Sequence, residues 1–213
     1  MNVPHAQPSA IDKDAVKARL AEIGPAICAI DGWLEPNDGG VLYQLARFVA
    51  PTASVVELGS WKGRSTAWLA HGLRDRGSGR MVAIDTWAGT LNEPDHARRL
   101  AGYGPDQLFE EFRANLRGFG LESLVEPWRM TTLEAARRWD RGVSIGLLHI
   151  DADHAYDGVR ADFEHWSPFV VRGGLVVFDD VPTWPGPTRL VTELPRWYRF
   201  YAATANQCVF IKE

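Results

Sequence analysis

The segment VVELGSWKGRSTAWLA, residues 55–70, decides the fold class. Residues 53–58 form an apolar strand pattern, Gly59 and Gly63 mark a turn, and residues 63–73 carry a helical pattern. Glycines let the backbone turn sharply and approach a ligand, and the free amide groups at the start of a helix favour anionic ligand groups. Taken alone, this segment fits an ordinary structural turn as well as a ligand-binding loop.

The same succession of strand, turn and helix repeats further along the chain. Strands are expected over residues 80–84, 123–127, 143–150 and 174–178, and helices over residues 105–119 and 159–169. The runs at 143–150 and 174–178 are almost entirely apolar, which is typical of central strands covered on both faces. The alternation predicts an α/β fold with a mostly parallel sheet and right-handed crossovers. Such a sheet binds its ligands beyond the carboxyl ends of its strands.

The N-terminal part departs from this alternation. Residues 11–23 and 41–49 have helical spacing, and we expect a helical cap over residues 11–52. The first helix is expected to end at Gly24-Pro25. Residues 1–10 contain two prolines and no periodicity, and this pattern predicts a flexible tail.

The remaining residues, 53–213, form the predicted core. Its last two apolar runs, 197–201 and 208–211, flank Ala205-Asn206 and predict an antiparallel hairpin at one edge of the sheet. Cap and core together make a single predicted domain over residues 11–213.

Composition excludes several classes of protein. The 213 residues include 27 acidic and 23 basic ones, a formal net charge of −4, which argues against binding nucleic acid through a basic surface. The 46% of apolar residues suit a packed domain. The two cysteines, Cys28 and Cys208, have no zinc-site spacing, and no signal peptide or apolar run of about 18 residues occurs. We therefore expect a cytoplasmic protein without a nucleic-acid or membrane partner.

Acidic residues stand where the expected strands end. Asp85 follows Gly63 by 22 residues, close to the spacing at which an acid after the second strand binds a ribose hydroxyl. The turn has the form E-x-G-x-x-x-G, in which Trp61 and Lys62 replace the open glycine-rich turn that a dinucleotide pyrophosphate needs. A nucleoside-containing ligand is therefore expected, and an NAD-type dinucleotide is disfavoured.

A second group of acids ends the later strands: Asp151, Asp179 and Asp180. Three adjacent carboxylates repel one another, and Mg²⁺ or Mn²⁺ would relieve the repulsion through oxygen ligation. Successive strand residues face opposite sides, so Asp179 and Asp180 can share one ion only if the strand ends or bends there. His154 lies three residues after Asp151, and the unperturbed pKa of a histidine, about 6.5, suits a general base, although an exposed loop histidine is the alternative.

These residues carry a resemblance to a known family. The segments VVELGSWKGRSTAWLA (55–70), MVAIDTWAG (81–89) and LLHIDADHAYDGVRADFEHWSPFVVRGGLVVFDDV (147–181) resemble those of class I S-adenosylmethionine (SAM)-dependent methyltransferases. More narrowly, the chain is similar to the metal-dependent O-methyltransferases that include the macrocin-type sugar enzymes and, more distantly, the catechol and caffeoyl-CoA enzymes. The resemblance implies a Rossmann-like fold with a mostly parallel seven-stranded sheet, an antiparallel C-terminal hairpin and an N-terminal helical cap.

The resemblance also implies site residues. The implied SAM site consists of Glu57, Gly59, Ser60, Gly63, Ser65, Asp85, Thr86, Trp87, Met130, Thr131 and Asp151. Glu57, Gly59, Ser60 and Gly63 would surround the methionine part, Asp85 the ribose, and Trp87 with Met130-Thr131 the adenine. The implied metal ligands are Asp151, Asp179 and Asp180, with His154 as the base and Asp151 beside it as a second catalytic residue.

Two differences from the catechol-type enzymes narrow the expected class of substrate. Catechol-type enzymes carry a lysine at the base position and an asparagine at the second acid of the pair, whereas this chain has His154 and Asp180. The macrocin-like branch, with a histidine and a Glu-Asp pair, fits better. We therefore expect Mg²⁺- or Mn²⁺-assisted methylation of a small-molecule hydroxyl, on a sugar or polyhydroxylated natural product, with residues 91–103 and 183–187 as substrate walls.

Alternatives remain at this point. One is a SAM methyltransferase that needs no metal, with Asp151 acting on the substrate directly. Another is a catalytically silent subunit of the same fold that serves as a binding module, and a third is a hydroxylase-like outlier of the superfamily. The sequence also leaves open whether the protein forms a homo-oligomer.

Overall fold

A seven-stranded sheet forms the centre of the protein, whose computed structural model describes residues 12–89 and 94–213. The strands are β1 (Ser54–Leu58), β2 (Met81–Asp85), β3 (Val125–Arg129), β4 (Ile145–Ile150), β5 (Val170–Phe178), β6 (Tyr198–Ala203) and β7 (Cys208–Lys212). Their order across the sheet is β3-β2-β1-β4-β5-β7-β6. The first five are parallel, and β7 pairs antiparallel with both β5 and β6. The predicted Rossmann-like fold with a C-terminal hairpin is confirmed.

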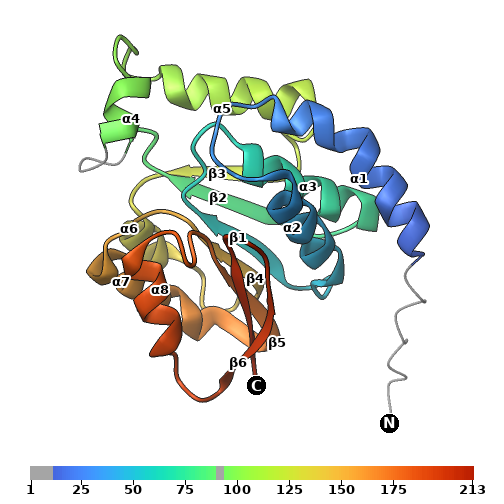
Figure 1. The fold of residues 1–213 in the computed structure, drawn as a ribbon, viewed down its shortest axis with the longest axis vertical. Helices are drawn as coiled ribbons and strands as arrows, with labels where there is room; N and C mark the ends of the chain where they lie inside the picture. Colours follow the sequence, from blue (N-terminus) through green and yellow to red (C-terminus); the bar gives the residue numbers. More distant parts are fainter. Residues whose placement is uncertain (1–11, 90–93) are drawn as a thin grey trace.

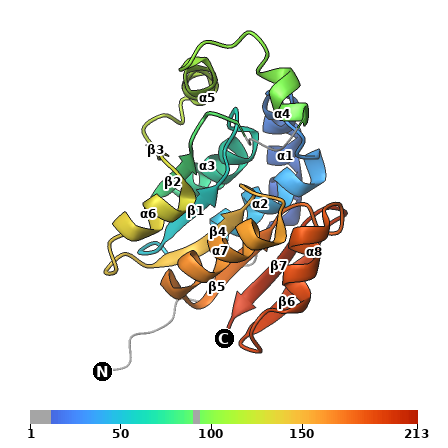
Figure 2. The same cartoon turned by 90° about the vertical axis from the view of Figure 1, so that its left-hand side faces the viewer.

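Helices cover both faces of this sheet (Figure 1). They are α1 (Lys13–Cys28), α2 (Pro36–Phe48), α3 (Arg64–Arg76), α4 (Pro94–Arg99), α5 (Gln107–Gly118), α6 (Thr132–Arg138), α7 (Tyr156–Trp166) and α8 (Pro185–Thr192), with a 3₁₀ turn at Ser167–Phe169. Helices α1, α2, α3 and α5 lie on one face, and α6, α7 and α8 lie on the other. Figure 2 shows the β6–β7 hairpin at the edge of the sheet opposite β3.

Successive residues of a central strand pack into two separate hydrophobic cores, one on each face of the sheet. Val55 packs among residues of α1, α2 and α3, whereas its neighbour Val56 packs among residues of α6 and α7. Both side chains are fully buried, and each such burial contributes about 1.5–3 kcal/mol. This explains why the central strands are apolar at nearly every position, and why a polar side chain within them is conspicuous.

The N-terminal helix is longer than predicted. Proline lacks the amide hydrogen and normally ends a helix, yet α1 continues past Pro25 to Cys28. Ile23 and Ile27 on either side of the proline are buried in the core, and this packing outweighs the lost hydrogen bond. The predicted end at Gly24-Pro25 is therefore wrong.

Three short helices were not predicted. Thr131 caps α6 through a reciprocal pair with Glu134, a signal that the T-x-x-E pattern carries. Helix α8 occupies part of the predicted loop 183–187 because Pro185 stands at its first position, where proline is tolerated. Helix α4 lies within the predicted wall 91–103. The predicted tail 1–10, residue 11, and residues 91–93 of that wall lie outside the described residues.

Among the helices within residues 12–89 and 94–213, none is both long and apolar enough to cross a membrane.

Candidate active site

The carboxyl ends of the parallel strands open into a cavity of about 1460 Å³. Ligand pockets typically measure about 300–1,000 Å³, so this cavity has room for two ligands side by side. Its walls include most of the residues expected to bind ligands: Gly59, Ser60, Ser65, Asp85, Thr86, Met130, Thr131, Asp151, His154, Asp179 and Asp180. The fold therefore brings together residues that are up to about 120 positions apart in sequence.

Asp85 organises the loop that follows β1. Its Oδ2 accepts hydrogen bonds from the backbone amides of Ser60 and Trp61, each at 2.9 Å, and its Oδ1 accepts one from the amide of Trp87 at 2.7 Å. Burial raises the pKa of Asp85, and the three amide hydrogen bonds oppose that rise. Two carboxylate oxygens offer about four acceptor positions, so one position remains for a ligand hydroxyl.

Glu57 stabilises the same loop through hydrogen bonds to its side chain. The side chain is fully buried, and its Oε2 accepts hydrogen bonds from Ser60 Oγ at 2.8 Å and from Thr66 Oγ1. Its Oε1 lies 3.4 Å from His149 Nδ1. Glu57 therefore lies behind the cavity wall and shapes it through Ser60.

Gly63 and Trp87 also lie behind the wall. Gly63 has φ +89 immediately before α3, and its Cα faces the ring of Phe112. Trp87 is only 2% exposed, packs 4.7 Å from both Phe109 and Phe112, and donates from Nε1 to the carbonyl of Trp61 at 2.8 Å. These contacts place the Trp87 ring in the core beside the loop.

The other side of the cavity is built by the turn between β3 and α6. Met130 and Thr131 line the cavity there, and Thr132 donates a hydrogen bond to Asp162 on α7. Beside them, Thr86 follows β2, and Ser65 lies in the first turn of α3. These four predicted residues therefore border the same space from three different strand ends.

The three acids predicted to ligate a metal line the same cavity and fall into two groups that share Asp151. Strand β5 ends at Phe178, and Asp180 adopts φ 61, so the chain turns and both Asp179 and Asp180 line the cavity with Asp151. Ligand atoms of Asp151, His154 and Asp180 lie within 4.8 Å of one another, as do those of His149, Asp151 and Asp179. Burial, together with the charge of Asp179, raises the pKa of Asp151 to about 7.

His154 lies at the edge of this acid cluster, which we define as Asp151, Asp179 and Asp180. Its Nε2 is 2.6 Å from Asp180 Oδ2 and 3.9 Å from Asp151 Oδ1, and its ring stacks on Trp184 with centroids 4.7 Å apart. Burial would lower the pKa of His154, but its hydrogen bonds to Asp151 and Asp180 raise it to about 11. The His154 side chain is only 15% exposed, so it differs from the exposed loop histidine of the alternative.

Sequence reasoning missed three polar residues of the site. His149 lies fully buried in β4, and its signal was a single polar residue within the apolar run LLHI. Gln207 Nε2 donates to Asp179 Oδ2 at 2.9 Å, and Asn206 Nδ2 donates to Asp180 Oδ1 at 3.0 Å. Both come from the turn of the β6–β7 hairpin, where no sequence pattern distinguishes a ligand-site residue from a turn residue.

The donor set fits a hard divalent cation. The acid cluster and Glu57 carry four negative charges when ionised, and His149 and His154 supply at most two positive ones. Two negative charges then remain uncompensated in a partly buried place, which is costly. Each of the two groups combines two carboxylates with one imidazole, and carboxylate oxygens are the ligands that Mg²⁺ and Mn²⁺ prefer.

Comparison with known families identifies the fold. Residues 56–181, more than half of the chain, match the family model described as a methyltransferase domain. The chain belongs to this family. The expectation of a methyltransferase is therefore confirmed, and the matched segment runs from β1 to the acid pair after β5.

Solved structures with the same fold as this methyltransferase cover nearly all of it. Cofactor-bound Rv0187 from MTB is 20% identical, with a TM-score of 0.63 and coverage of 96% of this chain and 92% of that one. The O-methyltransferase from Bacillus cereus in complex with SAH is 20% identical, with a TM-score of 0.56 and coverage of 96% and 94%. The O-methyltransferase TomG from Streptomyces achromogenes, involved in tomaymycin synthesis and solved with SAM, is 20% identical, with a TM-score of 0.60 and coverage of 96% and 93%.

A curated relative is similar over a shorter stretch. The uncharacterized protein y4gI from Sinorhizobium fredii is 32% identical over 98 residues, which are 46% of this chain and 10% of that protein. The chain thus spans about a tenth of the length of this relative.

Proposed function

We propose that this methyltransferase transfers the methyl group of SAM to a hydroxyl of a small molecule, assisted by Mg²⁺ or Mn²⁺. The observation that carries the proposal is the acid cluster with His154, which shares one cavity with the loop after β1. Structural relatives solved with SAM or SAH, and relatives described as O-methyltransferases, support the choice of cofactor and of oxygen as the acceptor atom.

The cofactor side of the cavity would be the loop after β1 and the turns after β2 and β3. Gly59 and Ser60 would border the methionine part of SAM, Asp85 has one acceptor position for a ribose hydroxyl, and Met130-Thr131 would border the adenine. SAM supplies a methyl group that is electrophilic because its sulfur is a sulfonium. The Asp85 amide bonds keep the loop in place before the ligand arrives, which lowers the entropy lost on binding.

The acceptor side would be the acid cluster with His154. Asp151, Asp179 and Asp180 would hold the cation, which lowers the pKa of a substrate hydroxyl and offsets the negative charge that keeps a proton on His154. His154 Nε2 would then accept the proton of that hydroxyl. Trp184 restricts the rotation of the His154 ring by stacking on it.

The acceptor would carry two neighbouring hydroxyls, as a sugar or a polyhydroxylated natural product does. Two adjacent oxygens can share one cation, and this fixes the reacting oxygen relative to the methyl group. The acceptor side is rimmed by Thr183 and Asn206, which are hydrogen-bonded to each other, and by the exposed ring of Trp184.

Methyl transfer from isotopically labelled SAM to a panel of vicinal diols tests the proposal. We expect transfer with Mg²⁺ or Mn²⁺ and its loss with a chelator, whereas undiminished transfer in chelator would exclude the metal. His154→Ala should lower turnover by about 10²–10⁴-fold and leave the affinity for S-adenosylhomocysteine (SAH) nearly unchanged. The control is His165→Ala, which removes an exposed histidine of α7. Equal turnover of the two variants would remove His154 from the mechanism, and absence of SAH binding to the wild type would overturn the proposal.

A further inference from the structure

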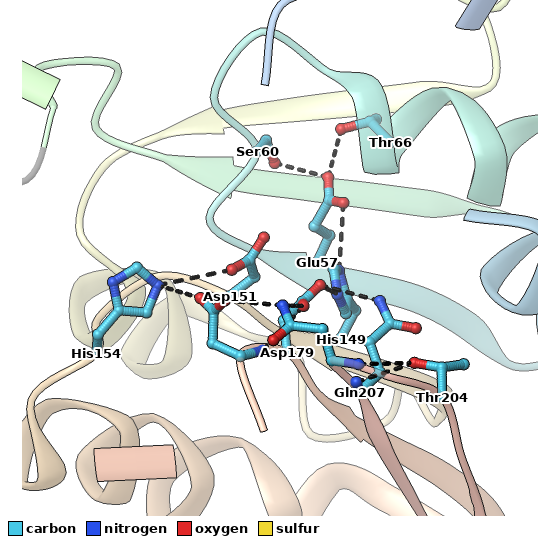
Figure 3. A network of polar contacts seen from close by, with 11 residues as sticks. Glu57, Ser60, Thr66, His149, Asp151, His154, Asp179, Thr204 and Gln207 are labelled. Carbon is cyan, nitrogen blue, oxygen red and sulfur yellow. Dashed lines mark hydrogen bonds and ion pairs between the residues drawn. The ribbon is translucent and has the colours of Figure 1, made fainter. Parts of the chain in front are cut away.

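A buried histidine joins the two sides of the cavity (Figure 3). His149 lies on β4 directly opposite Glu57 of β1 in the parallel register, and its side chain is fully buried. Its Nδ1 is 3.4 Å from Glu57 Oε1, and its Nε2 is 3.2 Å from Asp179 Oδ2. The three side chains form a continuous polar bridge at the end of the sheet.

The ring has a carboxyl group at each of its two nitrogens. Nε2 is within hydrogen-bond distance of Asp179 Oδ2, and Nδ1 is at ion-pair distance from Glu57 Oε1. Removing the ring would leave both buried carboxyl groups without this polar neighbour, and burying a polar group without a partner is costly. The bridge therefore fixes where the Glu57 and Asp179 carboxylates point.

Glu57 and Asp179 make further hydrogen bonds, which connect them to different parts of the site. Glu57 Oε2 accepts hydrogen bonds from Ser60 Oγ and Thr66 Oγ1, which hold the loop after β1 and the first turn of α3. Asp179 Oδ1 accepts a hydrogen bond from the backbone amide of Asp180 at 2.9 Å, and Oδ2 accepts one from Gln207 Nε2 at 2.9 Å. One end of the bridge thus shapes the loop, and the other shapes the acid cluster.

We propose that His149 is a positioning residue shared by the two binding sites, so that the cofactor loop and the metal-binding carboxylates take up their binding geometry together. This inference rests on the proposed function, because it assigns the loop to SAM and the acid cluster to a divalent cation. It predicts that a change at one end of the bridge alters ligand binding at the other end. A histidine that only fills space in the core would not transmit such a change.

The first experiment measures the two ligands separately. SAH affinity is measured by calorimetry in chelator, and Mn²⁺ affinity by electron paramagnetic resonance without SAH. His149→Gln should weaken each by about tenfold, the lower end of what loss of a residue supporting metal ligands costs. The control is His71→Gln, which alters another buried histidine, 3% exposed on α3 and outside the cavity, and should change neither affinity.

The second experiment tests transmission with isosteric variants at the two ends. Thr66→Val removes a hydrogen bond to Glu57, and Gln207→Leu removes one to Asp179; both residues are fully buried. Thr66→Val should weaken Mn²⁺ binding and Gln207→Leu should weaken SAH binding by about twofold or more, the coupling usual within one network. In the His149→Phe background these cross-effects should disappear.

The outcomes separate the two proposals. If the wild type binds no SAH, the proposed function fails and the inference fails with it. If the wild type binds SAH and Mn²⁺ but neither isosteric variant has a cross-effect, only the role of His149 is overturned. Cross-effects that persist in His149→Phe would likewise overturn it. Should the His149 variants not fold, the cross-effects of Thr66→Val and Gln207→Leu, measured with His149 in place, decide the question.

Discussion

Replacing Gly59 by alanine should damage both stability and cofactor binding, and the structure supplies a matched control. Gly59 has φ +84, and a Cβ built there would lie 2.1 Å from the carbonyl oxygen of Asp151 and 2.8 Å from the Cα of Ala152. Both are backbone atoms, so no side-chain rotation relieves the contact. Gly77 has nearly the same φ, +82, but a Cβ there would meet nothing within 4 Å.

The two variants therefore share the conformational penalty and differ in the clash. A non-glycine residue in the left-handed region costs about 1–2 kcal/mol, which both Gly59→Ala and Gly77→Ala should show. Forcing a methyl group against packed atoms adds about 1–3 kcal/mol, and only Gly59→Ala should show this. Because relief requires β1 and β4 to move apart at their carboxyl ends, SAH affinity should fall by at least tenfold in Gly59→Ala and stay unchanged in Gly77→Ala.

Urea unfolding followed by circular dichroism gives the free energy of unfolding of each variant, and calorimetry gives the SAH affinity. The clash is isolated by subtracting the loss of stability in Gly77→Ala from that in Gly59→Ala. If the two losses are equal, or if Gly59→Ala binds SAH like the wild type, the close approach of Gly59 to Asp151 does not constrain the site and the reasoning fails.

Three further predictions concern other parts of the cavity. Burial raises the pKa of Asp162 to about 7, so the folded state favours the protonated carboxyl group. The contribution of this group to the free energy of unfolding is therefore complete below pH about 4 and is lost as the pH rises to about 7. Asp162→Asn should flatten that decline, which urea midpoints measured from pH 4 to 8 would show; an unchanged profile contradicts the assignment. Asp85→Asn leaves a single side-chain oxygen to accept hydrogen bonds from three backbone amides, and it should weaken SAH binding by about tenfold in calorimetry. Retained affinity would show that the loop holds its shape without this carboxylate. Trp184→Ala should lower turnover severalfold with little change in melting temperature, because the ring stacks on His154 and is 40% exposed. Trp184→Phe should restore most of the turnover, and equal loss in both variants would argue against stacking.

The sequence was sufficient for features that depend on local pattern. Apolar runs located the central strands, because both faces of these strands are buried, and acids at the strand ends located the cavity. That Asp179 and Asp180 can both line the cavity follows from the end of the strand at Phe178. Helix α6 was also within reach, since Thr131 and Glu134 form a recognisable cap.

Features that depend on tertiary contacts were beyond the sequence. The continuation of α1 past Pro25 depends on what Ile27 packs against. Trp87 lies two residues after Asp85 in sequence, but its ring turns into the core because Phe109 and Phe112 of α5 offer it an aromatic surface. The role of His149 depends on the strand register that places it opposite Glu57. The register between two strands far apart in sequence cannot be predicted from the sequence of either strand.

The strand-end acids divide into two kinds according to how far the protein itself satisfies them. Asp85 receives three backbone amides, and Glu57 receives two hydroxyls and faces an imidazole, so hydrogen bonds from the fold hold these carboxyl groups in place. Burial raises the pKa of both Asp85 and Asp151, but three amide hydrogen bonds oppose the rise at Asp85, whereas the charge of Asp179 adds to it at Asp151. An acid that the fold compensates can shape a loop, whereas one that the fold leaves in electrostatic conflict gains from a cation. The chemistry of this methyltransferase should therefore be sought at Asp151 and its neighbours, with Glu57 and Asp85 as the framework that holds the loop after β1 beside them.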